Sequence, residues 1–208
     1  MQFRETLRAL VPAAGLSARM GDFKPLLPLR GRTLIENSID SLLQSGAKTV
    51  TVVTGFRAAE VEAALEQYGS LVHCVRNPDY ARTDMLCSIR IGVRALPPCG
   101  AFYLLPGDMP VVSQPTFERL CKARNTKRAS VIFPTLDGYR KHPPLIDARL
   151  IPEIASFHGR GGLRELWKKY ENEILTVPVD DRGVRVDLDT ADDYLRCRKM
   201  YDPHAADR

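Results

Sequence analysis

The stretch that decides the fold is residues 10–29, which read LVPAAGLSARMGDFKPLLPL. The apolar run at residues 7–12 predicts a short buried strand, and the small residues at 13–15 predict a tight turn directly after it. Residues with little or no side chain let backbone N–H groups approach an anion closely. Arg19 and Lys24 then supply two cations that can bind phosphate. We therefore expect a strand that leads into a phosphate-binding loop.

Two well-known phosphate-binding loops do not match this stretch. The Walker loop is excluded because no Gly-Lys-Ser/Thr follows the turn. The dinucleotide fingerprint is excluded because Gly15 and Gly21 do not have the G-x-G-x-x-G spacing. A plain strand–turn connection with two solvated cations is the structural alternative, but the combination of small residues with cations favours phosphate binding.

Strand-like and helix-like segments alternate outward from this loop. Helices are expected at 33–45, 58–68 and 84–96, and strands at 49–53, 71–75 and 101–105. Thr33 and Glu36 have the spacing of a capping box at the start of the first helix. Such alternation predicts an α/β fold, a Rossmann-like three-layer domain with a mostly parallel sheet and right-handed crossovers.

The second half of the chain has a weaker pattern. We expect a helix from Pro115, a strand at 130–134, an extended segment at 139–146, a helix at 163–170, strands near Leu175 and Val184, and a last helix from about Thr190. Residues 202–208 read as a frayed tail. Since there is no linker or internal repeat, we expect one domain over residues 1–208, with two small domains as the alternative.

Composition sets broad limits on function. Hydrophobic residues make up 44% and charged residues 26% of the 208, which is ordinary for a globular protein with a sizeable core. The net charge of +5 suits an anionic ligand, although it is also common in proteins that bind none. Five scattered cysteines without a C-x-x-C pair favour a reducing cytoplasm. We expect no membrane span and no nucleic-acid binding, because neither pattern is present.

Residues 11–24 resemble the signature L-x-A-A-G-x-S-x-R-M-G-x-x-K of the MobA-like molybdenum-cofactor nucleotidyltransferase family, with Val-Pro in place of the usual Leu-Ala. The resemblance extends over about residues 7–194 and is greatest to the CTP:molybdopterin cytidylyltransferase branch. It implies a glycosyltransferase-A-type fold. Later matching segments follow in the same order: Asn77-Pro-Asp-Tyr, Met85-Leu-Cys-Ser-Ile-Arg-Ile-Gly, Pro106-Gly-Asp-Met-Pro, Tyr139-Arg-Lys-His-Pro-Pro and Asp187-Leu-Asp-Thr-Ala-Asp-Asp-Tyr.

The resemblance implies a set of nucleotide-binding residues, with Lys24, Arg19 and Asp108 catalytic. The nucleotide-binding half would span about 7–112 and the acceptor-binding half about 113–200. The nucleotide would be bound by Pro12, Ala13, Ala14, Gly15, Ser17, Arg19, Lys24, Ser88 and Asp108. On the residues alone, a hydroxyl inside a helix is the favoured interpretation of Ser88.

For the metal, the resemblance implies Mg²⁺ held by Asp108 and Asp189, with Asp187 the near alternative. An acidic residue that follows a parallel strand lies where such sheets bind ligands, and carboxylates suit Mg²⁺. The strand expected at 184–188 would place Asp187 and Asp189 on the same side. As structural alternatives, Asp108 could simply stabilise the turn in which it stands, and Asp189 could cap the helix that follows it.

The implied reaction moves CMP from CTP to a phosphorylated small-molecule acceptor, molybdopterin in this branch, with release of pyrophosphate. CTP is favoured over GTP because relatives that use GTP generally carry Gly-Gly in place of the alanines. His142 and Arg164 would bind the acceptor. A molybdoenzyme or its maturation factor is a candidate partner for the product.

Two departures from the family pattern lie on the acceptor side. Lys141 stands where glycine commonly precedes His-Pro, and residues 159–164 read GRGGLR where the family commonly shows G-D-x-G-x-R. Both changes add positive charge. A cytidylyltransferase for a sugar, alditol or choline phosphate therefore stays open, as does a non-catalytic nucleotide-sensing or cofactor-handling module. A Rossmann oxidoreductase is disfavoured by the absent fingerprint.

Overall fold

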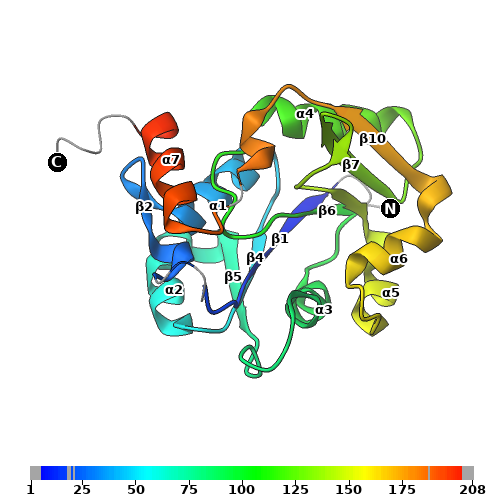
Figure 1. The fold of residues 1–208 in the computed structure, drawn as a ribbon. Coiled ribbons are helices and arrows are strands. Elements are labelled where there is room, and N and C mark those ends of the chain that lie inside the picture. The colour runs from blue at the N-terminus through cyan, green and yellow to red at the C-terminus, as the bar shows by residue number, and fades with distance from the viewer. Residues whose placement is uncertain (1–5, 18–19, 21, 187, 203–208) are drawn as a thin grey trace.

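The centre of the molecule is an eight-stranded sheet, described here from a computed structural model for residues 6–17, 20, 22–186 and 188–202 (Figure 1). Its main path runs β5-β4-β1-β6-β9-β7-β10, and β8 pairs with β7 beside that path. The strands are β1 (Leu7–Ala13), β4 (Val50–Thr54), β5 (Val72–Arg76), β6 (Ala101–Leu104), β7 (Val131–Leu136), β8 (Tyr139–Arg140), β9 (Leu145–Asp147) and β10 (Ile174–Pro178).

The strand directions confirm the predicted α/β class with a mostly parallel sheet. β1 pairs in parallel with β4 on one side and with β6 on the other, while β9 runs antiparallel to both β6 and β7. The chain proceeds from β1 to β4 and β5, and then returns to the opposite side of β1 to form β6. The strand order therefore reverses between β1 and β6, and sheets of this kind bind ligands beyond the carboxyl ends of the strands at such a point.

Helices cover both faces of the sheet, because successive side chains of the buried strands point to opposite sides. Along β1, Ala9 and Val11 contribute to the core on one face and Leu10 to the core on the other. The first face is covered by α1 (Leu34–Gln44), α2 (Ala58–Leu65) and α4 (Gln114–Thr126), and the second by α3 (Met85–Ala95), α5 (Ile151–Ser156) and α6 (Leu163–Lys169) (Figure 1).

The last helix, α7 (Ala191–Tyr201), lies beside a small hairpin of β2 (Pro28–Leu29) and β3 (Arg32–Thr33) at one end of the molecule (Figure 1). A third, smaller apolar cluster holds α7 there, with Cys197 packed near Leu29 and Leu34. None of the helices in the described part of the chain is both long and apolar enough to cross a membrane.

The predicted capping box at the start of α1 is confirmed. The Thr33 hydroxyl oxygen accepts a hydrogen bond from the Glu36 backbone N–H at 3.3 Å, and the Thr33 N–H donates to the Glu36 carboxylate at 2.7 Å. These two bonds satisfy backbone groups that have no partner within the helix, so the local sequence fixes where α1 begins.

The prediction of a strand near Val184 is wrong. The backbone there forms a 3₁₀ turn, Arg182–Arg185, and the buried Asp181 carboxylate accepts a hydrogen bond from the Gly183 N–H at 2.8 Å. A carboxylate that bonds the backbone two residues ahead favours a turn over a strand. The strand argument for placing Asp187 and Asp189 on one side therefore fails, and Asp187 itself lies outside the described residues.

Two other expected elements have different bounds. The helix expected at 58–68 ends at Leu65, and a 3₁₀ segment, Glu66–Leu71, follows with a kink at Gly69 (φ 53°). The helix α5 was not expected, because its six residues are too few to show a helical period and Pro152 stands in its first turn. Most of the expected tail, residues 203–208, lies outside the described part.

Candidate active site

A cleft of about 1090 Å³ opens at the carboxyl ends of β1 and β6, where the strand order reverses. It collects residues from both halves of the chain. The predicted site residues that line it are Pro12, Ala13, Gly15, Ser17, Lys24, Asp108, His142, Arg164 and Asp189.

Lys24 lies at the centre of this cleft between two carboxylates. Its Nζ is 3.1 Å from Asp189 Oδ1 and 3.4 Å from Asp108 Oδ2. The lysine side chain is only 9% exposed, whereas the two carboxylates are 33% and 28% exposed. The fold therefore joins three segments that are far apart in the sequence into one charged cluster.

The loop between β1 and Lys24 is shaped by Ser17. Ser17 has a left-handed backbone (φ 53°), which turns the chain back, and its hydroxyl oxygen accepts a hydrogen bond from the Lys24 N–H at 3.2 Å. Lys24 is followed by Pro25 in a short 3₁₀ turn whose first residues are buried. This local bonding fixes the backbone of Lys24 and directs its side chain into the cleft.

Asp108 is positioned by an extension of the pairing between β6 and β1. Beyond the last ladder pair, the Leu105 N–H donates to the Leu10 carbonyl at 3.0 Å, and the Gly107 N–H donates to the Pro12 carbonyl at 3.3 Å. A Cβ on Gly107 would lie 3.3 Å from the Ala13 Cβ, so the two chains run close together. Asp108 follows directly and reaches the same cleft as the loop after β1.

Asp189 is held by the residues on both sides of it. Leu188 is fully buried in the cluster that contains Met20 and Val111. Thr190 caps α7, with its N–H donating to the Asp193 carboxylate at 2.9 Å. The carboxylate of Asp189 is thereby presented to Lys24, and it is Asp193 that bonds the backbone at the start of α7.

The pair of Asp108 and Asp189 fits a Mg²⁺ site by its chemistry. Both carboxylates contact the same Lys24 ammonium, so the fold brings their oxygen atoms, which are hard ligands, to one place in the cleft. Mg²⁺ is commonly held by one or two carboxylates together with substrate phosphate oxygens. Among the described residues no group of three or more His, Cys, Asp or Glu side chains could hold a metal, so any ion here needs oxygens from a substrate or water as well.

His142 lies on the cleft wall that the later segments build. Burial lowers the pKa of its imidazole to about 4, and the nearby cations of Arg164 and Lys141 act in the same direction, while the Asp108 carboxylate opposes them. His142 is therefore neutral near pH 7. A neutral imidazole can accept or donate a hydrogen bond to a bound ligand without adding charge.

The structure does not bring all of the predicted nucleotide-binding residues to the cleft wall. Ser88 is buried inside α3, where its hydroxyl oxygen accepts a hydrogen bond from Asn77 Nδ2 at 3.1 Å. The reading of Ser88 as a helix-interior hydroxyl is the one that this geometry supports. Ala14 is buried, and its carbonyl accepts from the Phe56 N–H at 3.2 Å. Arg19 lies outside the described residues.

Other cleft residues were not assigned from the sequence. Asp84, at the N-cap of α3, and Ile89 lie on the cleft wall beside Met85, while Arg185 reaches it from the turn that replaces the expected strand. Trp167 of α6 forms part of the wall and packs edge-to-face on Phe133 at 6.2 Å between ring centroids. Asp84 could have been predicted, because it stands at the start of an expected helix. The positions of Arg185 and Trp167 on the cleft wall could not, because they depend on long-range packing.

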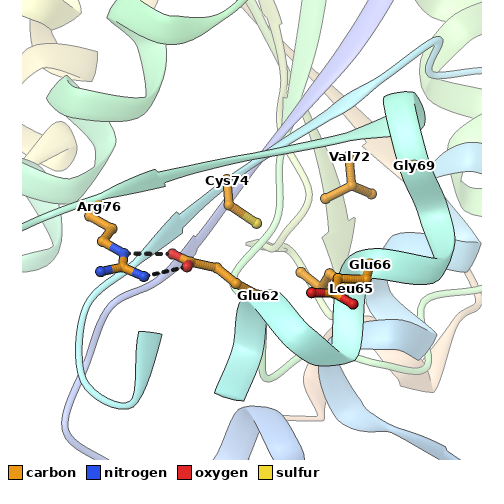
Figure 2. Close-up of a pocket in the computed structure, with 7 residues that line it drawn as sticks. All are labelled: Glu62, Leu65, Glu66, Gly69, Val72, Cys74 and Arg76. Atoms are coloured by element: carbon orange, nitrogen blue, oxygen red, sulfur yellow. Dashed lines mark hydrogen bonds and ion pairs between the residues drawn. The ribbon is translucent and has the colours of Figure 1, made fainter. Parts of the chain in front are cut away.

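A second, smaller hollow of about 380 Å³ lies between α2 and β5 (Figure 2). Its main charged groups satisfy each other, since the Arg76 guanidinium donates to the Glu62 carboxylate at 2.8 and 2.5 Å. Burial raises the pKa of the Cys74 thiol there to about 11, which makes it a poor nucleophile near neutral pH. The larger cleft is therefore the candidate active site.

A three-layer α/β fold with a lysine and two carboxylates gathered at its switch point is the arrangement of an α/β enzyme with a ligand site beyond its strands. The chain belongs to the MobA-like NTP transferase family, whose domain pattern matches residues 9–174. It is a nucleotidyltransferase by family, in agreement with the resemblance that the sequence motifs indicated.

Two relatives match along nearly their whole length. The molybdenum cofactor cytidylyltransferase of Escherichia coli (strain K12) is 29% identical over 194 residues, covering 92% of this chain and 95% of the relative. The nicotine blue oxidoreductase of Paenarthrobacter nicotinovorans is 32% identical over 193 residues, covering 88% and 92%. The family therefore includes a relative named for redox chemistry as well as one named for nucleotidyl transfer.

Solved structures show the same fold. A nucleotidyl transferase from Methanothermobacter thermautotroptrophicus superposes with a TM-score of 0.79 at 31% identity, covering 94% of this chain and 97% of the other. Rv0371C from Mycobacterium tuberculosis H37Rv, in complex with manganese, superposes with a TM-score of 0.72 at 25% identity, covering 92% and 97%.

Proposed function

We propose that the protein transfers CMP from CTP to a phosphorylated small-molecule acceptor, with molybdopterin the first candidate, and releases pyrophosphate. The observation that carries this proposal is the contact of the Lys24 ammonium with both Asp108 and Asp189 in the cleft beyond β1 and β6. This cluster places one ammonium and two carboxylates beside the loop that we expect to bind phosphate. Such a set can neutralise a triphosphate and help align it for attack.

In this proposal the loop of residues 12–17 receives the triphosphate and Lys24 neutralises its charge. No protein nucleophile is needed, because the acceptor phosphate is ionised near pH 7 and its oxygen can attack the α-phosphorus directly. The difficulty is to bring two anions together, so positioning and charge stabilisation are the expected contributions of the protein.

Mg²⁺ would be held by Asp108 and Asp189, and when bound it would neutralise charge on the phosphate oxygens. The manganese complex of the mycobacterial relative supports a divalent ion in this family. We expect EDTA to abolish pyrophosphate release and added Mg²⁺ or Mn²⁺ to restore it. Activity that is unaffected by EDTA would remove the metal from the proposal.

We choose molybdopterin as the first acceptor because of the similarity to the molybdenum cofactor cytidylyltransferase. We choose CTP because of that similarity and because alanines precede Gly15. The test is pyrophosphate release with CTP or GTP and Mg²⁺, each with molybdopterin and with a panel of sugar, alditol and choline phosphates. Faster release with CTP, dependent on one of these acceptors, supports the proposal. A strong preference for GTP, or release that needs no acceptor, contradicts it.

A second candidate is a redox activity, because one relative that spans nearly the whole chain is named as an oxidoreductase. The absence of a G-x-G-x-x-G fingerprint in the loop after β1 argues against nicotinamide binding by the usual route. Titration with NADH and NADPH, followed by fluorescence, separates the two. Binding of either dinucleotide that survives excess CTP would favour the redox candidate.

A further inference from the structure

The cleft contains two cations that form no ion pair with a carboxylate in the described part of the chain. Of the lysines and arginines that line its described part, Lys24, Arg140 and Arg185 each form an ion pair. Lys141 and Arg164 form none with any described residue. An unneutralised pair of cations on a concave wall attracts an anionic ligand.

Lys141 and Arg164 act on the same space although 22 residues of chain separate them. Both are close enough to His142 to affect its imidazole electrostatically, and the Asp108 carboxylate is near it as well. The backbone N–H of Lys141 donates to the Pro134 carbonyl at 2.8 Å, which ties the lysine to β7. The two cations therefore line the same cleft as the carboxylates of the proposed metal site.

The approach to Arg164 is left open by small residues. Gly161 and Gly162 line the cleft immediately before it, and a Cβ built on Gly162 would meet no atom within 4 Å, whereas one on Gly161 would lie 3.2 Å from the Glu165 side chain. The floor beside them is the Trp167 ring, which is packed on Phe133 and buried. The backbone at Gly162 therefore leaves open space beside Arg164.

We propose that Lys141 and Arg164 form a two-cation clamp for the phosphorus oxyanion of the acceptor, and that the clamp selects acceptors with a dianionic phosphate or phosphonate. Acceptors that would attack through a hydroxyl or a carboxylate are disfavoured. This deepens the proposed function and rests on it. It assigns specificity to Lys141, a residue at which the family commonly has glycine.

The clamp is consistent with the chemistry of the transfer. One acceptor oxygen forms a bond to the α-phosphorus of CTP, the bond between that phosphorus and the bridging oxygen to the β-phosphorus breaks, and the electron pair leaves with pyrophosphate. No proton has to be removed when the acceptor is a dianion. Two cations favour the dianion over the monoanion by their charge, and they also offset its repulsion from the triphosphate.

Inorganic phosphate is the probe that tests the clamp without knowing the acceptor. We would titrate it into the full-length protein by calorimetry, alone and with CTP and Mg²⁺ present, for the wild type and for Lys141→Ala and Arg164→Ala. Each variant should bind phosphate about tenfold or more weakly, the loss typical of one charge-assisted hydrogen bond, while Lys141→Arg should retain most of the affinity. Binding should persist when CTP is present.

Arg140→Ala is the matched control, because Arg140 is the preceding residue on the same wall and its charge is already neutralised by Glu171. It should leave phosphate affinity nearly unchanged. Equal weakening in Arg140→Ala, displacement of phosphate by CTP, or no measurable phosphate binding would each overturn the clamp.

The pH dependence gives a second readout. A phosphate monoester loses its second charge below about pH 6, so binding of the acceptor should weaken there in the wild type and less so in Lys141→Ala.

The proposed function and the clamp can be contradicted by different results. If no triphosphate is ever turned over but phosphate binding depends on Lys141 and Arg164, the transfer reaction fails and the clamp stands. If CMP transfer is found with unchanged acceptor KM in both variants, the clamp fails and the proposed function stands.

Discussion

Lys24 is the residue on which the proposed chemistry depends most, since its ammonium contacts both carboxylates of the cleft. We expect Lys24→Ala to lower the turnover of CTP by on the order of 10² to 10³, the scale of losing one preorganised charge contact. Lys24→Arg keeps the charge and should lose less. Turnover is measured as pyrophosphate release at saturating CTP, with circular dichroism to confirm that each variant is folded. Near-normal turnover in Lys24→Ala would remove this lysine from the mechanism.

His142 is the residue at which stability and pH are linked. Its pKa in the folded protein is about 4, below the ordinary value of 6.5, so between these two values the unfolded chain binds a proton that the folded chain does not. The contribution of the neutral imidazole to stability is complete above pH 6.5 and is lost as the pH falls toward 4. We therefore expect the free energy of unfolding of the wild type, relative to His142→Asn, to decrease over this window.

The measurement for His142 is urea unfolding of both proteins at about pH 7, 5.5 and 4.5. Because other groups titrate in both proteins, only the difference between the two curves reports on His142. A difference that is constant across the three pH values would show that the imidazole is not protected from protonation.

At the scale of elements, Asp181 ties the turn that precedes Asp189 to the start of α4. Its buried carboxylate accepts hydrogen bonds from the Ser113 N–H at 2.9 Å, the Ser113 hydroxyl at 2.8 Å, the Thr116 hydroxyl at 2.7 Å and the Gly183 N–H at 2.8 Å. Asp181→Ala should cost about 3 kcal/mol of unfolding free energy, because it leaves buried donors without an acceptor. Asp180→Ala, at the exposed neighbouring position, is the control and should change stability by less than about 0.5 kcal/mol.

The Asp181→Ala variant also tests whether Asp181 positions Asp189 in the cleft, apart from its effect on stability. Since the segment after Asp181 leads to Asp189, we expect CTP turnover of folded Asp181→Ala to fall as well, with less effect in Asp180→Ala. Stability is measured by urea unfolding and turnover by pyrophosphate release at a temperature where both variants are folded. A stable Asp181→Ala protein with full turnover would show that this network does not position the site.

The elements that could be predicted from the sequence are those whose cause is local. The capping box of Thr33 and the apolar stripe of α1 act within one or two helical turns, and the strands next to β1 are short runs of β-branched or apolar residues. The turn at 182–185 could not be predicted as such, because its backbone depends on Asp181, whose carboxylate also bonds Ser113 on a distant segment. α5 was missed because six residues show no period.

At the scale of the whole molecule, the meeting of Lys24 and Asp108 could be predicted because each follows a buried strand within a recognisable motif. The parallel pairing of β1 with β4 and β6 then brings Lys24 and Asp108 together, as their positions after neighbouring strands imply. The approach of Asp189 depends on the packing of Leu188 and α7. The hydrogen bond from Asn77 to the Ser88 hydroxyl likewise joins two separate segments, and neither arrangement is visible in the local pattern.

Ligand binding should stabilise the whole molecule, because the cleft is closed by segments from both halves of the chain. At a free CTP concentration about 100 times its Kd in the presence of Mg²⁺, mass action adds about 2.7 kcal/mol to the free energy of unfolding. For a chain of this size such a gain raises Tm by roughly 5 to 10 °C. CTP should shift Tm more than GTP at equal concentration, and Lys24→Ala should lose much of the shift, whereas Asp180→Ala should retain it. Differential scanning fluorimetry makes the comparison without an acceptor. No shift with any triphosphate and Mg²⁺ would contradict nucleotide binding in this cleft, and an equal shift in Lys24→Ala would place the nucleotide elsewhere.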